Sequence, residues 1–293
     1  MIMNAEKKGK DLIIKELKDF DLAQTMECGQ CFHFVRVDDE EYEISAYGKF
    51  LRVRQEKGKL VLFDTPKKDL ENIWKGYFDL ERDYGKIKRF IVKRSPELKD
   101  IVKKNNGIRI LNQEFFETLM SFIISQNNRI PRIKSLVASI SEKWGNRLTD
   151  TMYSFPDAKQ IEKVCEDDFR DLKTGFRAAY LCDAVKKVLS GDIEDNKLKT
   201  APLKECEDML CDIKGVGPKV ANCIMLFSLG KREAFPIDVW MKRIMEELYF
   251  GGKEQSLKTI SDLAKEKFGE YGGYAQQYLF AYAREQGAVK NNG

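Results

Sequence analysis

Two different periods of hydrophobic and polar positions divide the chain. From about Leu12 to Asp64, apolar and polar residues alternate, and turn residues separate the alternating runs. The clearest of these runs are residues 42–47, 50–54 and 59–63. From about Lys68 onward, the apolar positions recur with the period of an amphipathic helix. The pattern therefore predicts an antiparallel sheet followed by a long helical region, which is an α+β fold.

The helical period continues almost to the C-terminus. The predicted helices are residues 68–76, 79–94, 96–104, 114–126, 131–144, 158–165, 167–173, 177–190, 203–212, 218–229, 238–248, 255–267 and 273–286. We therefore predict a β-rich N-terminal domain with linking helices at residues 1–105, and a helical domain at residues 106–293.

The composition is compatible with two domains but does not decide the function. The chain has 293 residues, of which 43% are hydrophobic and 33% charged, and its net charge is only +4. This balance neither requires nor excludes nucleic acid, because binding depends on a local basic patch. No apolar run is long enough to span a membrane, and the charged residues 1–19 contain no cleavable signal. We therefore expect a soluble, cytoplasmic protein without a membrane partner.

Cysteine and histidine content limits the available chemistry. The seven scattered cysteines favour free thiols in a reducing compartment over a disulfide framework. Cys28 and Cys31 form the only Cys-x-x-Cys pair, which makes a poor zinc site without a second pair. His33 is the sole histidine, so neither a His-based metal centre nor a Ser-His-Asp triad is expected. We expect no cofactor and no metal, which leaves lysine and carboxylate chemistry.

One lysine follows a glycine-rich turn at a predicted helix start. Gly215 and Gly217 can form a tight turn and Pro218 suits a first helical turn, so Lys219 is expected at a helix N-terminus. The exposed N–H groups and the helix dipole there attract an anion, and we expect the backbone around Gly215 and Gly217 to bind a DNA phosphate. The same field disfavours a protonated ammonium, which makes the amine a better nucleophile.

Asp238 lies nineteen residues after Lys219, where Pro236 ends one segment and the aspartate can cap the next helix. Taken alone, the pair could be a surface lysine and an N-cap. However, residues 215–221 followed by 236–239 resemble the helix-hairpin-helix and Gly/Pro…Asp motif of the HhH-GPD DNA glycosylase superfamily. The resemblance is closest to the 8-oxoguanine DNA glycosylase/AP lyases, and it implies that Lys219 and Asp238 are the catalytic residues.

Five positions resemble the base-recognition residues of that family. Residues 29–32 look like its Gly-Gln-x-Phe turn, which implies that the Gly29 carbonyl accepts a hydrogen bond from the N7 hydrogen of 8-oxoguanine. Gln276 would then bond the Watson–Crick edge of the flipped base, between Phe280 and Cys223 as stacking walls. Phe227 replaces a methionine that lines the family's pocket. Ordinary core packing is the alternative for each of these side chains.

Four further positions resemble the family's DNA contacts. Asn127 corresponds to the asparagine that enters the gap left by the extruded nucleotide, and Arg132 to an arginine that reads the opposite cytosine. Phe176 corresponds to the wedging aromatic, since a planar apolar group can replace the stacking lost on base flipping. Arg177 follows as a second cytosine contact, because a guanidinium offers parallel donors to a base edge.

The resemblance also implies an architecture, an activity and a partner. The expected layout is a small TATA-binding-protein-like domain packed on a two-part helical domain, with the active site in a cleft. The expected activity is excision of 8-oxoguanine through a lysine Schiff base, followed by β-elimination at the abasic site. The partner would be double-stranded DNA with 8-oxoguanine opposite cytosine, bound by a monomer at the nucleoid of a bacterium or archaeon. Trp240 departs from the family, whose eukaryotic members have histidine there.

Two alternatives remain open at this point. A related glycosylase could remove another damaged base, although Gly29 and Gln276 argue against it. A non-catalytic helix-hairpin-helix DNA-binding module would need only the turn at residues 215–217, and it would leave Lys219 and Asp238 unexplained.

Overall fold

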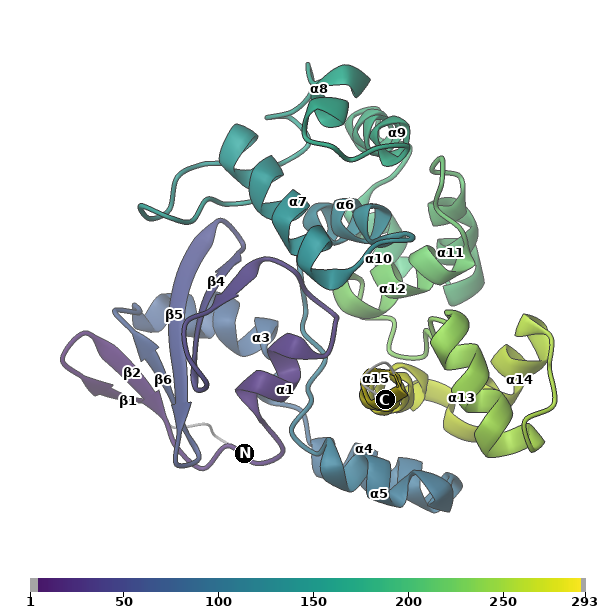
Figure 1. Ribbon diagram of the computed structural model, residues 1–293. Coiled ribbons are helices and arrows are strands. Elements are labelled where there is room, and N and C mark those ends of the chain that lie inside the picture. The colour runs from purple at the N-terminus through teal and green to yellow at the C-terminus, as the bar shows by residue number, and fades with distance from the viewer. Residues whose placement is uncertain (1–4, 291–293) are drawn as a thin grey trace.

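The N-terminal part of the protein is a six-stranded antiparallel sheet, as predicted (Figure 1). The computed structural model describes residues 5–290, and the side chains through Arg284. The strand order is β1-β2-β6-β5-β4-β3, with every neighbouring pair antiparallel. The strands are β1 (Ala5–Lys8), β2 (Asp11–Ile14), β3 (Phe34–Arg36), β4 (Glu41–Ala46), β5 (Lys49–Glu56) and β6 (Lys59–Phe63).

The sheet buries the apolar side of its alternating strands. Leu51 and Val53 of β5 are buried whereas Arg52 between them is exposed, which is the outcome expected for one covered face. Helix α1 (Leu22–Glu27) and the segment 67–77 contribute to the same core, where Trp74 is almost fully buried. The segment 67–77 consists of α2 (Lys67–Asp69), a π-helical turn η1 (Leu70–Trp74) and α3 (Lys75–Tyr77).

The remainder of the described chain is helical and forms two groups around a second core. One group comprises α6 (Phe115–Ser125), α7 (Ile130–Trp144), α8 (Glu166–Asp171), α9 (Arg177–Leu189), α10 (Asp195–Thr200), α11 (Leu203–Cys211) and α12 (Pro218–Ser228). The other comprises α4 (Tyr84–Arg94), η2 (Pro96–Leu98), α5 (Lys99–Lys104), α13 (Val239–Phe250), α14 (Leu257–Phe268), η3 (Gly269–Tyr271) and α15 (Gly272–Lys290).

The chain crosses between these groups twice. Residues 105–114 lead from α5 to α6, and residues 229–238 lead from α12 to α13. The linking helices α4 and α5, which we assigned to the N-terminal domain, pack against α14 and α15 (Figure 1). The boundary at residue 105 stays a prediction. None of the helices in the described part of the chain is both long and apolar enough to cross a membrane.

Several boundaries differ from the prediction, and one predicted helix is wrong. Residues 158–165 form turns, closed by i→i+3 bonds such as Val164 N to Ile161 O at 3.1 Å. The backbone bonds within the segment join residues three apart, as in Glu162 N to Lys159 O at 3.3 Å, so the segment forms tight turns and no α-helix. Helix α4 begins at residue 84, five residues later than predicted, because the Asp83 carboxylate caps it by accepting from Lys86 N at 2.9 Å.

The pattern also missed short elements. Strand β1 is exposed along most of its length and therefore has no apolar alternation to detect. Helices α1 and α10 each have only six residues, which is too short for a clear helical period.

Candidate active site

Lys219 lies in the first turn of α12, as the sequence predicted. Gly217 is the N-cap and Pro218 occupies the first helical position. The side chain of Lys219 is half-buried, and its Nζ lies 5.6 Å from the centroid of the Phe122 ring. The helix N-terminus therefore holds the amine against an aromatic wall at the edge of the core.

The hairpin before Lys219 requires glycine at one position. Gly215 has φ of +79°, and a Cβ added there would lie 2.2 Å from Cδ2 of Tyr180 on α9. The same hairpin is tied to α9 by the Lys214 N–H, which donates to Asp183 Oδ2 at 2.7 Å. Gly217 has nothing within 4 Å of an added Cβ, so its surroundings leave the backbone open to a ligand. Conformation and packing therefore both select glycine at position 215.

Asp238 is the N-cap of α13. Its Oδ1 accepts a hydrogen bond from the Met241 N–H at 2.7 Å, and its backbone is extended. This bond fixes the carboxylate at the end of the 229–238 crossing, and the aspartate remains partly exposed. The predicted capping role is therefore present, and it places the carboxylate beside the cleft rather than in the core.

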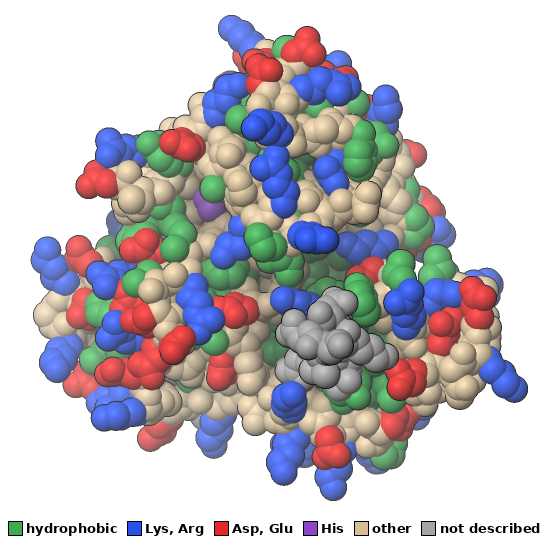
Figure 2. All heavy atoms as spheres, viewed as in Figure 1, with side chains coloured by type: hydrophobic (Ala, Val, Ile, Leu, Met, Phe, Trp, Pro, Cys, Tyr) green, Lys and Arg blue, Asp and Glu red, His purple; other side chains and the backbone are tan. Residues whose placement is uncertain are grey.

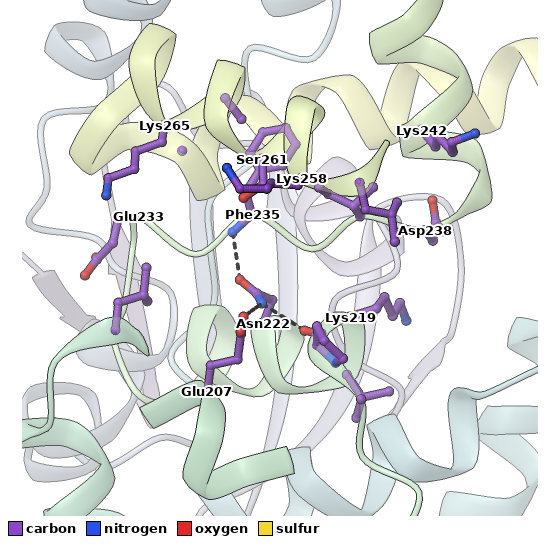
Figure 3. Close-up of a pocket in the computed structure, with 18 of the residues that line it drawn as sticks. Glu207, Lys219, Asn222, Glu233, Phe235, Asp238, Lys242, Lys258, Ser261 and Lys265 are labelled. Carbon is purple, nitrogen blue, oxygen red and sulfur yellow. Dashed lines mark hydrogen bonds between the residues drawn. The ribbon is translucent and has the colours of Figure 1, made fainter. Parts of the chain in front are cut away.

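Lys219 and Asp238 line one cleft between the two helical groups (Figure 3). The cleft has a volume of about 1860 Å³, and Figure 3 shows the two residues on opposite walls toward the same end of it. Asn127 and Gly217 also line it. Trp240, which is 44% exposed, does so next to Asp238, and the Arg243 guanidinium lies 5.6 Å from its ring centroid. The helix-hairpin-helix amides, the lysine and the carboxylate therefore share one opening.

An aromatic and thiol wall continues from Lys219 into the core. Phe122 stacks on Phe227 with ring centroids 5.4 Å apart, and Phe32 meets Phe122 edge-on at 5.6 Å. Cys223, one turn after Lys219, is buried, and burial raises the pKa of its thiol. The nearby Lys219 ammonium opposes this rise in pKa only partly. Cys223 therefore presents a neutral, polarisable surface, which suits stacking.

The Gly29 turn meets α15, which places two predicted base-recognition residues together. Gly29 has φ of +85°, and an added Cβ would lie 3.1 Å from Cε1 of Phe280. Next to it, Arg284 Nη1 donates to the Glu27 carbonyl at 2.6 Å. The residues that line the large cleft do not include Gly29, Cys223, Phe227, Gln276 or Phe280, so the structure does not bring the predicted base-recognition residues into that cleft.

Gln30 anchors the Gly29 turn, and no role was predicted for it from the sequence beyond its place in the Gly-Gln-x-Phe motif. Its side-chain amide donates to the carbonyls of Thr25 at 2.8 Å and Arg109 at 2.7 Å, while its Oε1 accepts from Leu111 N at 2.8 Å. Gln113 then joins the turn to the aromatic wall, because its Nε2 donates to Gln30 O at 2.8 Å and its N–H to Phe227 O at 2.8 Å. In the sequence, the only indication of this role was the position of Gln30 within the Gly-Gln-x-Phe motif.

Gln276 carries an unsatisfied acceptor. The side chain is 5% exposed, its Nε2 donates to Pro236 O at 3.4 Å, and its Oε1 has no partner among the described residues. A buried carbonyl oxygen without a donor is costly, so its persistence points to a ligand that supplies one. Gln276 lies four residues before Phe280 on α15, so the two side chains share one helix face.

The predicted DNA-contact residues gather on two neighbouring loops. Phe176 is 51% exposed before α9, with its ring edge-on to Tyr180 at 5.8 Å. Asn127, directly after α6, adopts φ of +48°. Arg132, in the first turn of α7, donates to Lys173 O at 3.1 Å and thereby joins α7 to the loop that precedes Phe176. The exposed Phe176 is available to insert into DNA.

Arg177 is more buried than a free base-reading arginine would be. Its Nε donates to Gln126 O at 2.9 Å, its Nη2 to Asn127 O at 2.9 Å, and its Nη1 to Thr174 O at 3.2 Å. Burial is the main cause of the lowered pKa of this guanidinium. These bonds tie Arg177 to the Asn127 loop, and a contact with cytosine would have to replace some of them.

The surface supports a polyanionic ligand on this side of the molecule. Figure 2 shows Lys and Arg side chains over the α7–α9 part of this face, above a hollow at its centre where hydrophobic side chains are exposed. Among the described residues, no group of three or more His, Cys, Asp or Glu side chains could hold a metal ion. All seven cysteines are free thiols.

The fold and this site define a helix-hairpin-helix protein with a lysine and an aspartate at its cleft. The model for the 8-oxoguanine DNA glycosylase N-terminal domain matches residues 12–119, and the model for HhH-GPD superfamily base excision DNA repair proteins matches residues 120–270. The chain belongs to the 8-oxoguanine DNA glycosylase family within the HhH-GPD superfamily.

Solved structures and curated relatives match almost throughout. The Clostridium acetobutylicum 8-oxoguanine glycosylase/lyase, bound to double-stranded DNA with cytosine opposite 8-oxoguanine, is 42% identical, with a TM-score of 0.93 over 98% of this chain and 100% of its own. MBOgg1 with a low-affinity DNA ligand is 43% identical, with a TM-score of 0.94 and the same coverage. A probable N-glycosylase/DNA lyase of Methanothermobacter thermautotrophicus is 28% identical over 82% of this chain and 84% of its own length.

Proposed function

We propose that this protein is a bifunctional DNA repair enzyme that excises 8-oxoguanine from duplex DNA and then cleaves the strand at the resulting abasic site. One observation carries the proposal: Lys219, at the N-terminus of α12, and Asp238, at the N-cap of α13, line the same end of one cleft. A nucleophile and a carboxylate at a helix-hairpin-helix opening are the groups that this reaction needs.

Binding begins with the phosphates. The backbone N–H groups of Gly217 and the first turn of α12 point out of the helix N-terminus and can hold a phosphate of the lesion strand. Phe176 then fills the space of the extruded nucleotide together with Asn127, because a base taken out of the stack leaves its neighbours without a stacking partner.

The chemical step uses Lys219 and Asp238. The Lys219 amine, in its neutral form, attacks C1′ of the deoxyribose, the bond from C1′ to the base breaks, and the base leaves with its bonding electrons and takes up a proton. The Asp238 carboxylate stabilises the positive charge that develops on the sugar. Ring opening gives an iminium between Nζ and C1′. Loss of a C2′ proton then expels the 3′ phosphate, and hydrolysis frees the lysine.

Recognition of the oxidised base belongs to the wall behind Lys219. The Gly29 carbonyl would accept the N7 hydrogen that 8-oxoguanine carries and guanine lacks, and the unpartnered Gln276 Oε1 would accept from the Watson–Crick edge. Loss of one buried hydrogen bond costs about 1–3 kcal/mol, which corresponds to about ten- to a hundredfold discrimination. Phe280 beside Gly29 and Cys223 beside Lys219 would enclose the base.

The two alternatives make different predictions. A glycosylase for another base would not need the Gly29 turn against Phe280, and a binding module would not need Lys219 and Asp238 in one cleft. Arg132 and Arg177 support cytosine as the opposite base, since both lie at the Asn127 and Phe176 loops. Action as a monomer at the nucleoid of a bacterium or archaeon completes the proposal.

The test is borohydride trapping on three labelled duplexes: 8-oxoguanine opposite cytosine, undamaged guanine opposite cytosine, and an alkylated purine. We expect a covalent adduct and strand cleavage with the first duplex alone. An adduct with the alkylated purine instead would establish the related glycosylase. Binding without base release on any duplex would establish the binding module.

A further inference from the structure

A single amide side chain joins the two walls that carry Lys219 and Asp238. Asn222 lies on α12, one turn after Lys219, and lines the same cleft. Its Oδ1 accepts a hydrogen bond from the Phe235 N–H at 3.2 Å, and Phe235 is three residues before Asp238 (Figure 3). Asn222 therefore connects the helix of the nucleophile with the crossing that leads to the carboxylate.

The amide group of Asn222 is fully engaged. Its Nδ2 donates to Glu207 Oε2 on α11 at 2.6 Å and to Pro218 O at 2.8 Å, which uses both N–H donors (Figure 3). Pro218 directly precedes Lys219, so the second bond fixes the first turn of α12 itself. Glu207 is held in turn by Lys204, whose Nζ lies 3.3 Å from Oε1. The bonds to Glu207 and Pro218 therefore orient the amide so that its oxygen faces the Phe235 N–H.

The crossing has few other attachments to α12 near Asp238. Pro236 has no N–H and cannot donate a backbone hydrogen bond. Among the described residues of the crossing, Phe235 is the one nearest to Asp238 whose N–H is bonded to α12. On the opposite side, Phe235 stacks on Phe268 with ring centroids 6.3 Å apart, and Gln276 donates to Pro236 O. These contacts attach the crossing to α14 and α15. Lys231, whose N–H donates to Met225 O at 3.1 Å, and Arg232, whose Nη1 donates to Leu226 O, also join the crossing to α12, but both lie near its start. Asn222 is therefore the hydrogen-bond link to the helix of Lys219 that lies nearest to Asp238 among the described residues.

We propose that Asn222 is a positioning residue that sets the separation between Lys219 and Asp238, with Glu207 as the group that orients it. The inference deepens the proposed function and rests on it. Charge stabilisation by Asp238 depends on its distance from the sugar that Lys219 attacks, and a displacement of about 1 Å can cost about a hundredfold in rate. Attack of the lysine on the open aldehyde of an abasic site needs Asp238 less, because no glycosidic bond has to break.

The experiment measures single-turnover rates at saturating protein on two duplexes, one with 8-oxoguanine opposite cytosine and one with a preformed abasic site. For Asn222→Ala we expect base excision to fall about 10- to 100-fold, with unchanged duplex affinity and a smaller loss on the abasic site. Ser228→Ala is the matched control, because it removes a side-chain hydrogen bond from the same helix, Ser228 Oγ to Ile224 O at 2.8 Å. It should lower the melting temperature without a specific loss of excision.

An exchange of the two polar groups tests the connection directly. Asn222→Asp alone places two carboxylates together and should slow excision, because like charges repel. Adding Glu207→Gln restores a donor and an acceptor between positions 207 and 222 and keeps an acceptor for the Phe235 N–H. The double variant also has the wild-type net charge. We expect it to recover part of the excision rate, because the bond to position 207 and the acceptor for the Phe235 N–H return, whereas an aspartate at position 222 cannot donate to Pro218 O.

Failure of this inference and failure of the proposed function give different results. Wild-type protein that does not release 8-oxoguanine would refute the proposed function. The positioning role would be overturned by an active wild type together with an Asn222→Ala variant that keeps its rate, or that loses excision and abasic-site cleavage equally. Failure of the exchanged pair to recover activity, with a melting temperature like that of the wild type, would also overturn it.

Discussion

Two glycine turns, one in each part of the molecule, serve the site in different ways. The Gly215 hairpin is fixed by an aromatic ring, since Tyr180 occupies the space of a side chain. The Gly29 turn is fixed by buried hydrogen bonds through Gln30, and Phe280 lies at its outer side. The first turn leads into Gly217 and Lys219, which line the cleft, and the second lies against Phe280 of α15.

The difference between the two turns matches a proposed division between catalysis and recognition of the damaged base. The helix-hairpin-helix unit is proposed to supply the phosphate site and the nucleophile, whereas the N-terminal domain supplies the turn proposed to recognise the oxidised base. The two regions are joined by the extended residues 108–113, where Gln113 bonds both Gln30 and Phe227. A change in one turn should therefore affect a different step from a change in the other.

The largest effect is expected for Lys219→Gln, which removes the chemistry and leaves both turns intact. We expect no borohydride adduct and a fall in 8-oxoguanine excision of about a thousandfold or more, because no amine remains to form the Schiff base. Lys258→Gln is the control, since Lys258 lines the same cleft but pairs with Asp262 at 2.6 Å. An adduct that persists in Lys219→Gln would place the nucleophile on another residue.

Gly215→Ala should break the first turn. The positive φ and the contact with Tyr180 together should lower the free energy of unfolding by about 2–5 kcal/mol, and DNA binding should weaken. The measurement is denaturant unfolding beside Gly217→Ala, which meets nothing within 4 Å and should keep its stability. Adding Tyr180→Ala to Gly215→Ala should recover part of the stability, and no recovery would show that the ring is not the obstacle.

Gly29→Ala should affect the second turn more narrowly. The Cβ would lie 3.1 Å from Phe280 and shift the base-recognition wall, so 8-oxoguanine excision should fall about tenfold while cleavage of a preformed abasic site is retained. Gly58→Ala has a similar φ of +74° but nothing within 4 Å, and it controls for backbone strain alone. Equal losses on both duplexes would contradict a role in recognition.

Phe176→Ala tests the exposed aromatic ring that contacts Tyr180, the residue packed on the Gly215 turn. The ring is 51% exposed, so the free energy of unfolding should change by no more than about 0.5 kcal/mol. Excision from a paired duplex should slow about tenfold, with a smaller loss when the lesion is already unpaired, because less stacking has to be broken. The measurement is the ratio of the excision rate on the paired duplex to that on the unpaired lesion. A variant with the wild-type ratio would show that Phe176 does not act as a wedge between base pairs.

The smallest effect concerns stability where the N-terminal domain meets α6. Burial, with the charge of Glu117, raises the pKa of Glu114 to about 7, and its carboxylate accepts from Tyr47 N at 2.6 Å. The folded state therefore binds more protons than the unfolded state, so this group lowers stability as pH rises from about 4.5 to 7.

Glu114→Gln should remove that penalty. The variant should be more stable than the wild type by about 1 kcal/mol at pH 8, because the partial exposure of Glu114 reduces the effect of its raised pKa, and the difference should disappear toward pH 4.5. Urea unfolding across this pH range measures it. A pH-independent difference would mean that the carboxyl group does not titrate as described.

The amino-acid sequence determined the elements and the chemistry, because both depend on local pattern. The alternating and helical periods predicted the central strands and most long helices, and the motifs at Gly29, Lys219, Asp238 and Gln276 singled out the site. Residues 158–165 were mispredicted, since a short amphipathic pattern does not show whether enough turns follow to stabilise a helix.

Only the tertiary structure decided how these residues meet. The burial of Arg177, the contact between Gly215 and Tyr180 and the clamp from Asn222 to Phe235 all join segments that are 13 to 51 positions apart. Hydrogen bonds and steric contacts of this kind depend on distances that arise only when helices and loops pack. The spacing of Lys219 and Asp238 along the chain therefore indicated the reaction, whereas packing sets their separation in space.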